Sequence, residues 1–376
     1  MPSSSSCSRN WSTASTNRPV SEPPRPPPIG ERMIQRDGMG RAAFEELTAA
    51  GQIRRLRRLV SLAMTHHDID VARVRLAAQA FNTTFRVDAA DGRRYALRVG
   101  APCHLDTEGI AEVEAVWAAA LAAETLVAPP QVVRTRDGAA SVTVESEGIT
   151  GARTCVLFTW QEGRTMHGRL HDLDLVVAAG EVLAVLHAHA TGFDGVHADE
   201  VLRADRVCYL RLPDLLADRD ALFVEGAAWA QESIDRLWRD RGTAAHLLHG
   251  DFYPRNLLVR HGRVVPIDFQ DAVWGLEEQD LAITLVMLDH DDPSGGADAA
   301  LRRGYERRRS WPLVDPAARE RLTIARRLQI ANLQFNMRSS RTSPFVDDLA
   351  RDLRRLLRRR SDGIAGGTAG RPVGMP

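Results

Sequence analysis

The chain has 376 residues and carries 49 Lys and Arg against 49 Asp and Glu, so its formal net charge is zero. This balance offers no basic surface for nucleic acid, and a hydrophobic content of 44% is ordinary for a soluble globular protein. The length is sufficient for two domains or for one enzyme of two lobes.

Neither the cysteines nor the apolar runs indicate an exported or membrane protein. No two cysteines form a C-x-x-C pair, so they predict neither a zinc site nor a disulfide framework, and we expect a cytoplasmic location. The longest apolar stretch, residues 175–186, contains Gly180 and Glu181 and predicts a buried helix rather than a membrane span. The four cysteines are Cys7, Cys103, Cys155 and Cys208.

The N-terminal stretch combines an irregular leader with a helix. Residues 1–35 are rich in Ser, Pro and Arg, and this composition predicts disorder because it cannot bury a core. Residues 40–66 are predicted to be helical, since apolar residues recur on one face. A basic amphipathic helix can touch a membrane or nucleic acid, but we interpret this one as packing on the first domain. The apolar face comprises Ile53, Leu56, Val60 and Ala63.

Next in the chain comes a pattern of strands around one helix. Residues 81–87 and 94–99 are predicted strands, joined by a turn at Asp91-Gly92. An alanine-rich helix is predicted over 107–124. Further short apolar runs predict strands at 131–134, 141–144 and 156–160.

The second half is predicted to be mostly helical, with a Gly-rich, disordered tail from residue 361. Asp289, Asp291 and Asp292 end one of these helices. They could hold a cationic amine, although a solvated helix end is the plainer interpretation. The predicted helices are at 203–247, 279–287, 302–310, 319–337 and 349–360.

One stretch among these helices carries candidate metal ligands. Two short apolar runs flank residues 260–263 and predict a β-hairpin. If its connection has three residues centred on Gly262, Asn256 and Asp268 lie opposite each other across the strands. An amide oxygen and a carboxylate at that separation suit Mg²⁺, which takes a few oxygen ligands plus water and phosphate.

The spacing His249-x-Asp251-x₄-Asn256 matches the order of a kinase catalytic loop. In such loops a base Asp precedes a metal-binding Asn, and a second metal-binding Asp follows on the next strand, where this chain has Asp268. A hairpin with ordinary turn-capping residues leaves this order and spacing unexplained. We therefore predict that Asp251 orients the acceptor hydroxyl or accepts its proton, and that Asn256 and Asp268 bind the metal.

These motifs resemble those of the aminoglycoside phosphotransferase, choline kinase and type II homoserine kinase superfamily of small-molecule kinases. The similarity extends over about residues 40–345 and is specific for the superfamily rather than for a substrate. Its motifs lie at 82–87, 95–99, 114–121, 158–163, 186–189, 249–256, 267–269 and 279–282.

The resemblance implies an α+β, bilobal protein-kinase-like fold. A small antiparallel-sheet N-lobe is expected at 36–158 and a larger, mostly helical C-lobe at 159–360, between the leader at 1–35 and a disordered tail at 361–376.

The resemblance also implies how ATP is bound. Arg98 stands where many kinases carry Lys, and the chain contains no lysine; a guanidinium keeps its charge and presents a planar fork to phosphates. Glu114 is implied to pair with Arg98, while Asn82 and Thr83 cover the phosphates. A hinge over 158–161, including Phe158 and Trp160, is implied to contact adenine.

Two departures and one undecided residue accompany this picture. Gly250 replaces the Arg that eukaryotic protein kinases use to sense phosphorylation, so we expect constitutive activity. Gln270 is neutral where relatives often carry Asp, Glu or Gly, so either Asp271 compensates or the site binds a single ion more weakly. Asp280 either braces the catalytic loop or is an ordinary helix-start Asp.

The sequence thus predicts an ATP- and Mg²⁺-dependent phosphotransferase acting on a hydroxyl of a small molecule, such as an aminoglycoside, an amino-alcohol or a related metabolite. The alternatives are a Ser/Thr protein kinase of the bacterial stress-response type, which residues 269–272 and 279–281 also resemble, and a nucleotide-binding pseudokinase scaffold. A metal-dependent hydrolase is more remote because suitably spaced His ligands are missing. We expect no nucleic-acid or membrane partner; the acceptor and the oligomeric state stay undetermined.

Overall fold

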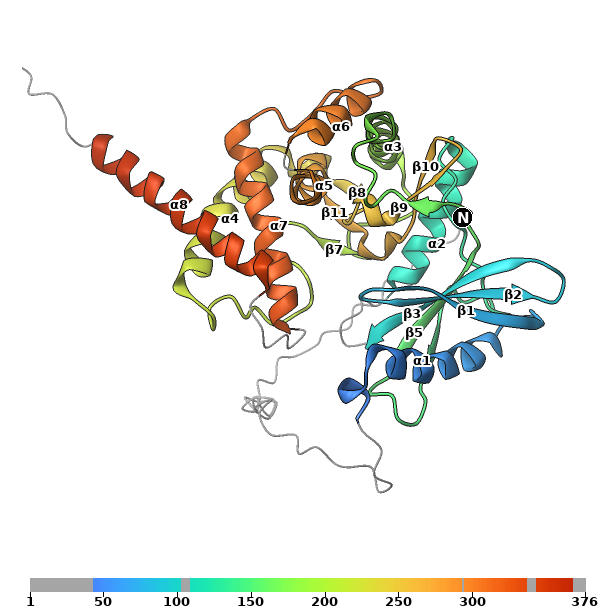
Figure 1. The fold of residues 1–376 in the computed structure, drawn as a ribbon. Helices are drawn as coiled ribbons and strands as arrows, with labels where there is room; N and C mark the ends of the chain where they lie inside the picture. Colours follow the sequence, from blue (N-terminus) through green and yellow to red (C-terminus); the bar gives the residue numbers. More distant parts are fainter. Residues whose placement is uncertain (1–42, 103–108, 293, 337–342, 368–376) are drawn as a thin grey trace, which may run out of the picture. The chain divides into compact units, whose positions relative to one another are not determined.

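The structure, a computed structural model, describes four stretches of the chain. A five-stranded antiparallel sheet occupies the N-terminal part and helices dominate the C-terminal part, which confirms the expected α+β, kinase-like fold (Figure 1). The leader expected at 1–35 lies outside the described residues. The described stretches are 43–102, 109–292, 294–336 and 343–367.

The N-terminal sheet has the strand order β1-β2-β3-β5-β4. Strand β1 was not expected, because its side chains are mostly exposed and give no alternating apolar pattern. The strand expected at 131–134 makes only an isolated bridge, from Val132 to Phe158. The strands are β1 Val71–Gln79, β2 Thr83–Ala89, β3 Arg94–Pro102, β4 Val142–Val144 and β5 Arg153–Thr159.

Two helices cover this sheet, one on each face. Because successive side chains of a strand point to opposite faces, alternate residues of β5 pack against different helices. Cys155 and Leu157 pack in one cluster with α1, whereas Val156 and Phe158 pack in another with alanines of α2. Of the expected apolar face of α1, only Ile53 is not fully buried. Helix α1 spans Ala49–Met64 and α2 spans Ile110–Glu124.

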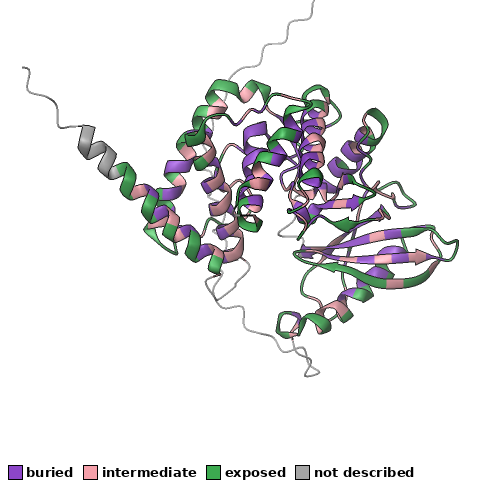
Figure 2. Ribbon diagram, turned by 45° about the horizontal axis from the view of Figure 1, so that its top comes forward, coloured by how far each residue is buried: buried purple, intermediate pink, exposed green. Residues whose placement is uncertain are grey.

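The helices of the C-terminal part enclose the largest hydrophobic cluster, and their residues are buried where the helices face one another (Figure 2). Helix α3 is long and apolar enough to cross a membrane by length and composition, yet 56% of that window is buried inside the protein. Gly180 and Gly304 let α3 and α6 meet backbone to backbone, since a Cβ at either position would overlap a carbonyl oxygen of the other helix.

Helix positions depart from expectation at three places, one of which is α6, expected at 302–310 and found at Gly296–Glu306. The chain from 204 to 220 is irregular, so the helix predicted at 203–247 begins only at Ala221, where Asp220 caps it. Helix α8 continues to Gly367, into the stretch where a disordered tail was expected. The helices are α3 Leu173–Gly192, α4 Ala221–Arg241, α5 Glu277–Asp291, α6 Gly296–Glu306, α7 Pro316–Asn336 and α8 Pro344–Gly367.

Short strands form two small sheets, β10-β9-β6 and β7-β11-β8. They bring the segments around residues 250 and 270 together, because β8 pairs with β11. Their bounds are β6 Arg164–Thr165, β7 Leu202–Arg203, β8 His246–Leu248, β9 Leu257–Arg260, β10 Arg263–Pro266 and β11 Val273–Gly275.

The predicted hairpin exists, but its predicted register is wrong by one residue. Arg260 pairs with Arg263, so the connection is the two residues His261 and Gly262, both with positive φ (49° and 74°). Such two-residue turns match the twist of paired strands. Ile267, rather than Asp268, therefore lies opposite Asn256, to whose carbonyl oxygen its N–H donates at 2.9 Å.

Candidate active site

The loop that follows β8 is held by a buried carboxylate and by a glycine. The backbone N–H groups of His249 and Gly250 donate to Asp280 at 3.2 and 3.0 Å. Gly250 has φ 76°, and a Cβ there would overlap the carbonyl oxygen of Asp271. Of the two interpretations of Asp280, the structure thus supports the brace, which fixes where Asp251 begins.

Asp280 is itself anchored by a buried histidine. His187 lies 3.1 Å from the Asp280 carboxylate through Nε2 and 2.9 Å from the Tyr305 hydroxyl through Nδ1. Burial alone would raise the pKa of Asp280, but the hydrogen bond and charge of His187, together with His249 and the Gly250 N–H, hold that pKa below its ordinary value. An ionised Asp280 is a strong acceptor for the loop's N–H groups.

Asp251 lies between an arginine and an amide. Its Oδ1 accepts from Arg326 Nη2 at 2.7 Å, and its Oδ2 accepts from Asn256 Nδ2 at 2.9 Å. Burial, reinforced by the charge of Asp268, raises the pKa of Asp251 to about 6, although Arg326 and Asn256 oppose the rise. The carboxylate is therefore mostly ionised at neutral pH and more basic than an ordinary aspartate.

Asn256 and Asp268 present oxygens to the same region despite the register shift. The Asn256 amide nitrogen donates to Asp251, and no described residue donates to its Oδ1. Asp268 has φ 64°, a left-handed conformation that redirects the chain directly after the hairpin. Its carboxylate is 29% exposed and accepts from Arg98 Nη1 at 2.7 Å through Oδ1.

Arg98 connects β3, α2 and the segment after β10. Its guanidinium donates to Glu114 in a bidentate pair, at 3.1 and 2.6 Å, besides its bond to Asp268. Glu114 also accepts the Phe269 N–H at 3.0 Å. The Glu114 side chain is 2% exposed, and this burial raises its pKa even though Arg98 opposes the rise. The pair expected from the sequence is thus present and almost fully enclosed.

The other residues predicted to bind nucleotide take different positions. Asn82 Nδ2 donates to Gln270 at 2.7 Å, so the β1–β2 connection contacts the segment after Asp268. Thr83 and Phe158 are buried, which leaves mainly their backbone for a ligand. The Trp160 side chain is half-buried. Whether these four contact nucleotide stays a prediction.

The charges at this centre do not balance. Asp271 lies near both arginines, yet burial and the charges of Asp251 and Asp268 raise its pKa to about 8. Four carboxylates face two guanidinium groups, an excess of two negative charges when all are ionised. The carboxylates belong to Glu114, Asp251, Asp268 and Asp271, and the guanidinium groups belong to Arg98 and Arg326.

A divalent cation fits this excess charge and the oxygen donors that surround it. The described residues contain no group of three or more His, Cys, Asp or Glu placed to hold a metal. Asn256 and Asp268 are the residues that would hold such an ion, together with oxygens from nucleotide or water, a ligand set that suits Mg²⁺ at phosphate sites.

Arg326 was not identified from the sequence, although a signal was present. It lies on the buried face of α7 with Leu322, Ala325 and Gln329, at the helical spacing i, i+3, i+4 and i+7. A charged residue on an otherwise buried helix face needs a partner, and here the partner is Asp251.

Comparison with known proteins gives a family match. The model of the family described as "Phosphotransferase enzyme family" (APH) matches residues 73–320. No curated protein matches the chain.

Solved structures show the same fold at low sequence identity. A microcompartment-associated aminopropanol kinase has a TM-score of 0.59 and 22% identity, covering 79% of this chain and 94% of its own. An amicoumacin kinase in complex with AMP-PNP, Ca²⁺ and Ami has 0.58 and 14%, covering 81% and 96%. The aminoglycoside phosphotransferase APH(4)-Ia has 0.53 and 18%, covering 85% and 100%.

Proposed function

Because this chain belongs to the phosphotransferase enzyme family and is a phosphotransferase acting on a hydroxyl group, we propose that it transfers the γ-phosphate of ATP to an alcohol of a small molecule with the help of Mg²⁺. Membership of the family agrees with the superfamily resemblance of the sequence. The observation that carries the finer proposal is the contact network that links Asp251, Asn256, Asp268, Arg98 and Glu114.

Each residue of this network has a role in the proposed transfer. Asp251, with a pKa of about 6, orients the acceptor hydroxyl and accepts its proton as the oxygen attacks the γ-phosphorus. The new P–O bond forms while the bond between the γ-phosphorus and the β,γ-bridging oxygen breaks, so ADP leaves. Arg98 binds phosphate oxygens, and Glu114 keeps its guanidinium in place.

Asn256 and Asp268 are the residues that would hold Mg²⁺. When bound, the ion supplies positive charge that offsets the negative charge of the phosphates. Two of the similar structures were solved with AMP-PNP, an ATP analogue, which supports ATP as the donor. We also propose constitutive activity, because Gly250 stands where eukaryotic protein kinases carry the arginine that senses a phosphorylated activation loop.

Several features favour a small-molecule enzyme over the alternatives. A pseudokinase does not need Asp251, Asn256 and Asp268, yet all three are present and lie close together. A narrow pocket beside Asp251 suits a small acceptor better than a protein segment. Cys155 and Cys208 are free thiols in the described part of the chain, which agrees with the proposed cytoplasmic location.

The test uses purified protein, MgATP and a panel of alcohols that includes amino-alcohols, hydroxy acids and aminoglycosides. Mass spectrometry is expected to detect a phosphorylated alcohol, and Asp251→Asn is expected to lower kcat by roughly 10²–10⁴-fold. Asp298→Asn, which changes an acid of α6 paired with Arg319, is the matched control and keeps wild-type activity.

The same protein is heated with ATP, with and without Mg²⁺. Stabilisation that depends on both supports the proposed donor and metal. Label from ATP in protein bands of a cell extract, rather than in low-mass products, would favour the protein-kinase alternative. Full activity of Asp251→Asn would exclude the proposed base.

A further inference from the structure

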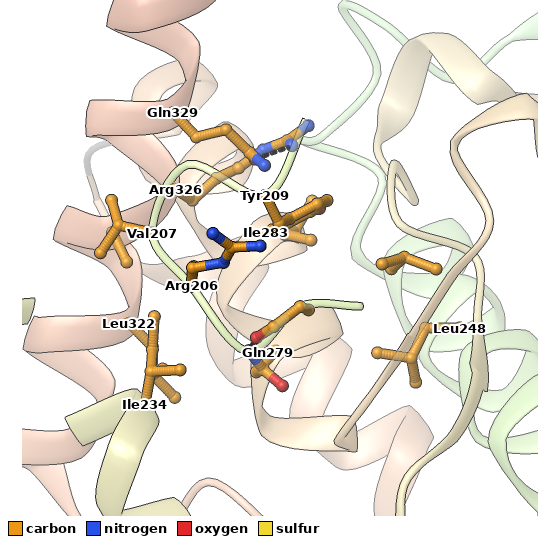
Figure 3. Close-up of a pocket in the computed structure, with 13 residues that line it drawn as sticks. Arg206, Val207, Tyr209, Ile234, Leu248, Gln279, Ile283, Leu322, Arg326 and Gln329 are labelled. Atoms are coloured by element: carbon orange, nitrogen blue, oxygen red, sulfur yellow. Dashed lines mark hydrogen bonds between the residues drawn. The ribbon is translucent and has the colours of Figure 1, made fainter. Parts of the chain in front are cut away.

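The helical part of the protein contains a small pocket (Figure 3), and one of its lining residues, Arg326, is hydrogen-bonded to Asp251. Its walls come from α4, α5 and α7, from β8 and β11, and from the loop at 204–209. The space open to the centres of water-sized molecules is about 30 Å³, and roughly 10–15 Å³ of such space holds one water. The pocket therefore accommodates a group of the size of a carboxylate, not a sugar ring.

The pocket is lined by hydrogen-bond donors and apolar side chains. Its two charged lining residues, Arg206 and Arg326, are both cationic, and none of the residues lining it is acidic. Arg206 is largely exposed, whereas the Arg326 side chain is only 14% exposed. A cationic amine meets no carboxylate on these walls, while an anion meets a partly buried guanidinium.

Arg326 lies between this pocket and Asp251. Its Nη2 donates to Asp251 at 2.7 Å and its Nη1 donates to Gln329 Oε1 at 2.6 Å. Its Nε is buried and has no acceptor among the described residues. A guanidinium has five N–H donors in a rigid fork, and leaving a buried one without an acceptor is unfavourable. An oxygen anion supplies the missing acceptor.

Gln329 adds a second donor to the same wall. Its side chain belongs to a residue that is 3% exposed, and the bond from Arg326 to Oε1 orients its amide. The Nε2 lies beside the phenol of Tyr209, outside hydrogen-bonding geometry, and no other described residue accepts from it. Two buried N–H donors on neighbouring side chains match the two oxygens of a carboxylate.

The acidic residues at the end of α5, which the sequence suggested as a site for an amine, are engaged elsewhere. Asp289, Asp291 and Asp292, at the end of α5, do not line the pocket, and each has a partner within the protein. The partners are Arg319 at 3.7 Å, His167 at 3.5 Å and the backbone N–H of Ala297 at 2.8 Å, respectively. This cluster is a stabilised helix end, as the plainer interpretation of the sequence has it.

We propose that the acceptor alcohol carries a carboxylate that enters this pocket and binds Arg326 and Gln329, which makes Arg326 a determinant of acceptor specificity. The inference rests on the proposed function, because that function places the acceptor hydroxyl at Asp251. One guanidinium contacts both Asp251 and the pocket, so only a few bonds separate the hydroxyl from the carboxylate. A carboxylate on Arg326 also shares the charge that otherwise neutralises Asp251, leaving Asp251 Oδ1 for the hydroxyl proton.

The experiment compares acceptors that differ only in the group at one end of a short chain: 3-hydroxypropanoate, 3-hydroxypropanamide and 3-amino-1-propanol. Phosphorylation of each with MgATP is measured by mass spectrometry, and binding of each is measured by calorimetry in the presence of Mg²⁺ and AMP-PNP. The carboxylate is expected to exceed the amine in kcat/KM, or in affinity, by about ten- to a hundredfold, with the amide between them.

Variants of α7 show whether Arg326 causes this preference. Arg326→Gln is expected to raise KM for the carboxylate and to remove its advantage over the amide, a ratio that a general loss of activity does not change. Arg326→Lys keeps the charge but not the fork, and is expected to keep part of the advantage. Arg327→Gln is the matched control, since Arg327 pairs with Asp352 of α8, and the acceptor ratios stay at the wild-type value.

Each outcome has a separate meaning for the two proposals. A carboxylate that binds or reacts no better than the amine overturns the inference, as does an unchanged ratio in Arg326→Gln. Phosphorylation of the amine with a higher kcat/KM than the carboxylate would overturn the inference and support the proposed function. Absence of Mg²⁺-dependent ATP binding, measured without any acceptor, would remove the proposed function itself.

Discussion

Arg98 from the sheet and Arg326 from α7 both contact the acidic centre, but they are held in different ways. Arg98 donates to the buried Glu114 through a bidentate pair and to Asp268 through one further bond. Arg326 has Asp251 as its one hydrogen-bonded carboxylate within the described chain, and a neutral glutamine as its other bonded partner.

The difference indicates two uses of the same side chain. If Asp268 binds a metal, as proposed, the bidentate pair with Glu114 still holds Arg98 in position on the proposed nucleotide side. The cation on the acceptor side is bonded to the proposed base, so a ligand carboxylate competes directly for it. The first arginine is thus held within the scaffold of the site, whereas the second is the one that the proposed acceptor carboxylate would engage.

The largest effect that sharpens this comparison is expected from Arg98→Gln. Removing the guanidinium leaves Glu114 buried without its cation, so kcat/KM for MgATP is expected to fall by about 10²-fold or more. The free energy of unfolding is expected to fall by about 3 kcal/mol. Steady-state kinetics and denaturant titration measure the two losses.

Two variants serve as references for Arg98→Gln. Arg93→Gln, at the exposed turn between β2 and β3, is the matched control and is expected to match the wild type. The double variant Arg98→Gln with Glu114→Gln is expected to regain stability without regaining activity. If Arg326→Gln raised KM for MgATP as strongly as Arg98→Gln, the division between a nucleotide side and an acceptor side would be wrong.

The next effect concerns the loop that places Asp251 beside Arg326. Gly250→Ala is expected to lower the free energy of unfolding by about 3 kcal/mol or more, because the new Cβ would overlap the Asp271 carbonyl oxygen at a left-handed φ. Gly262→Ala is the control: its φ is also positive, at 74°, but its Cβ would have no neighbour within 4 Å. Its expected loss is about 1 kcal/mol. Equal losses in the two variants, measured by denaturant titration, would show that the close contact at Gly250 does not cause the loss of stability.

The smallest effect tests Asp271, which lies near both arginines. Its pKa is about 8 in the folded protein against an ordinary value of 3.8, so the folded state keeps a proton that the unfolded chain has released. The retained proton stabilises the folded state at low pH, and this stabilisation is lost as the pH rises from about 4 to about 8.

Asp271→Asn is expected to remove that loss. Without ligand, the free energy of unfolding of the variant relative to that of the wild type is expected to increase by about 1–3 kcal/mol from pH 5 to pH 8.5. Denaturant titrations at the two pH values measure the change, and Asp298→Asn is the control with an unchanged slope. Parallel slopes for the wild type and Asp271→Asn would show that Asp271 is ionised throughout.

Much of the nucleotide side was predictable because its residues occupy fixed places in local patterns. Arg98 lies within an alternating strand, Glu114 lies on the next helix, and a fixed number of loop residues separates Asp251 from Asn256. The hairpin was also predictable, but its register depended on whether the turn has two or three residues, a choice that apolar spacing alone leaves open. The strand β1 was missed because its exposed side chains carry no apolar alternation.

The acceptor side was less predictable because its contacts cross long sequence separations. Arg326 is 75 positions from Asp251, in a chain with many arginines, and only its place on the buried face of α7 distinguished it. The pocket wall also includes the irregular stretch at 204–209, which the sequence predicted as helix.

By itself the sequence determined the order of the catalytic residues, the α+β class and the family, because these depend on local periodicity and on short, fixed spacings. Only the tertiary structure decided which cation neutralises Asp251 and which donors line the pocket beside it. Those choices follow from how α5, α7 and the loop at 204–209 pack around one core, and packing brings together residues whose separation along the chain carries no periodic signal.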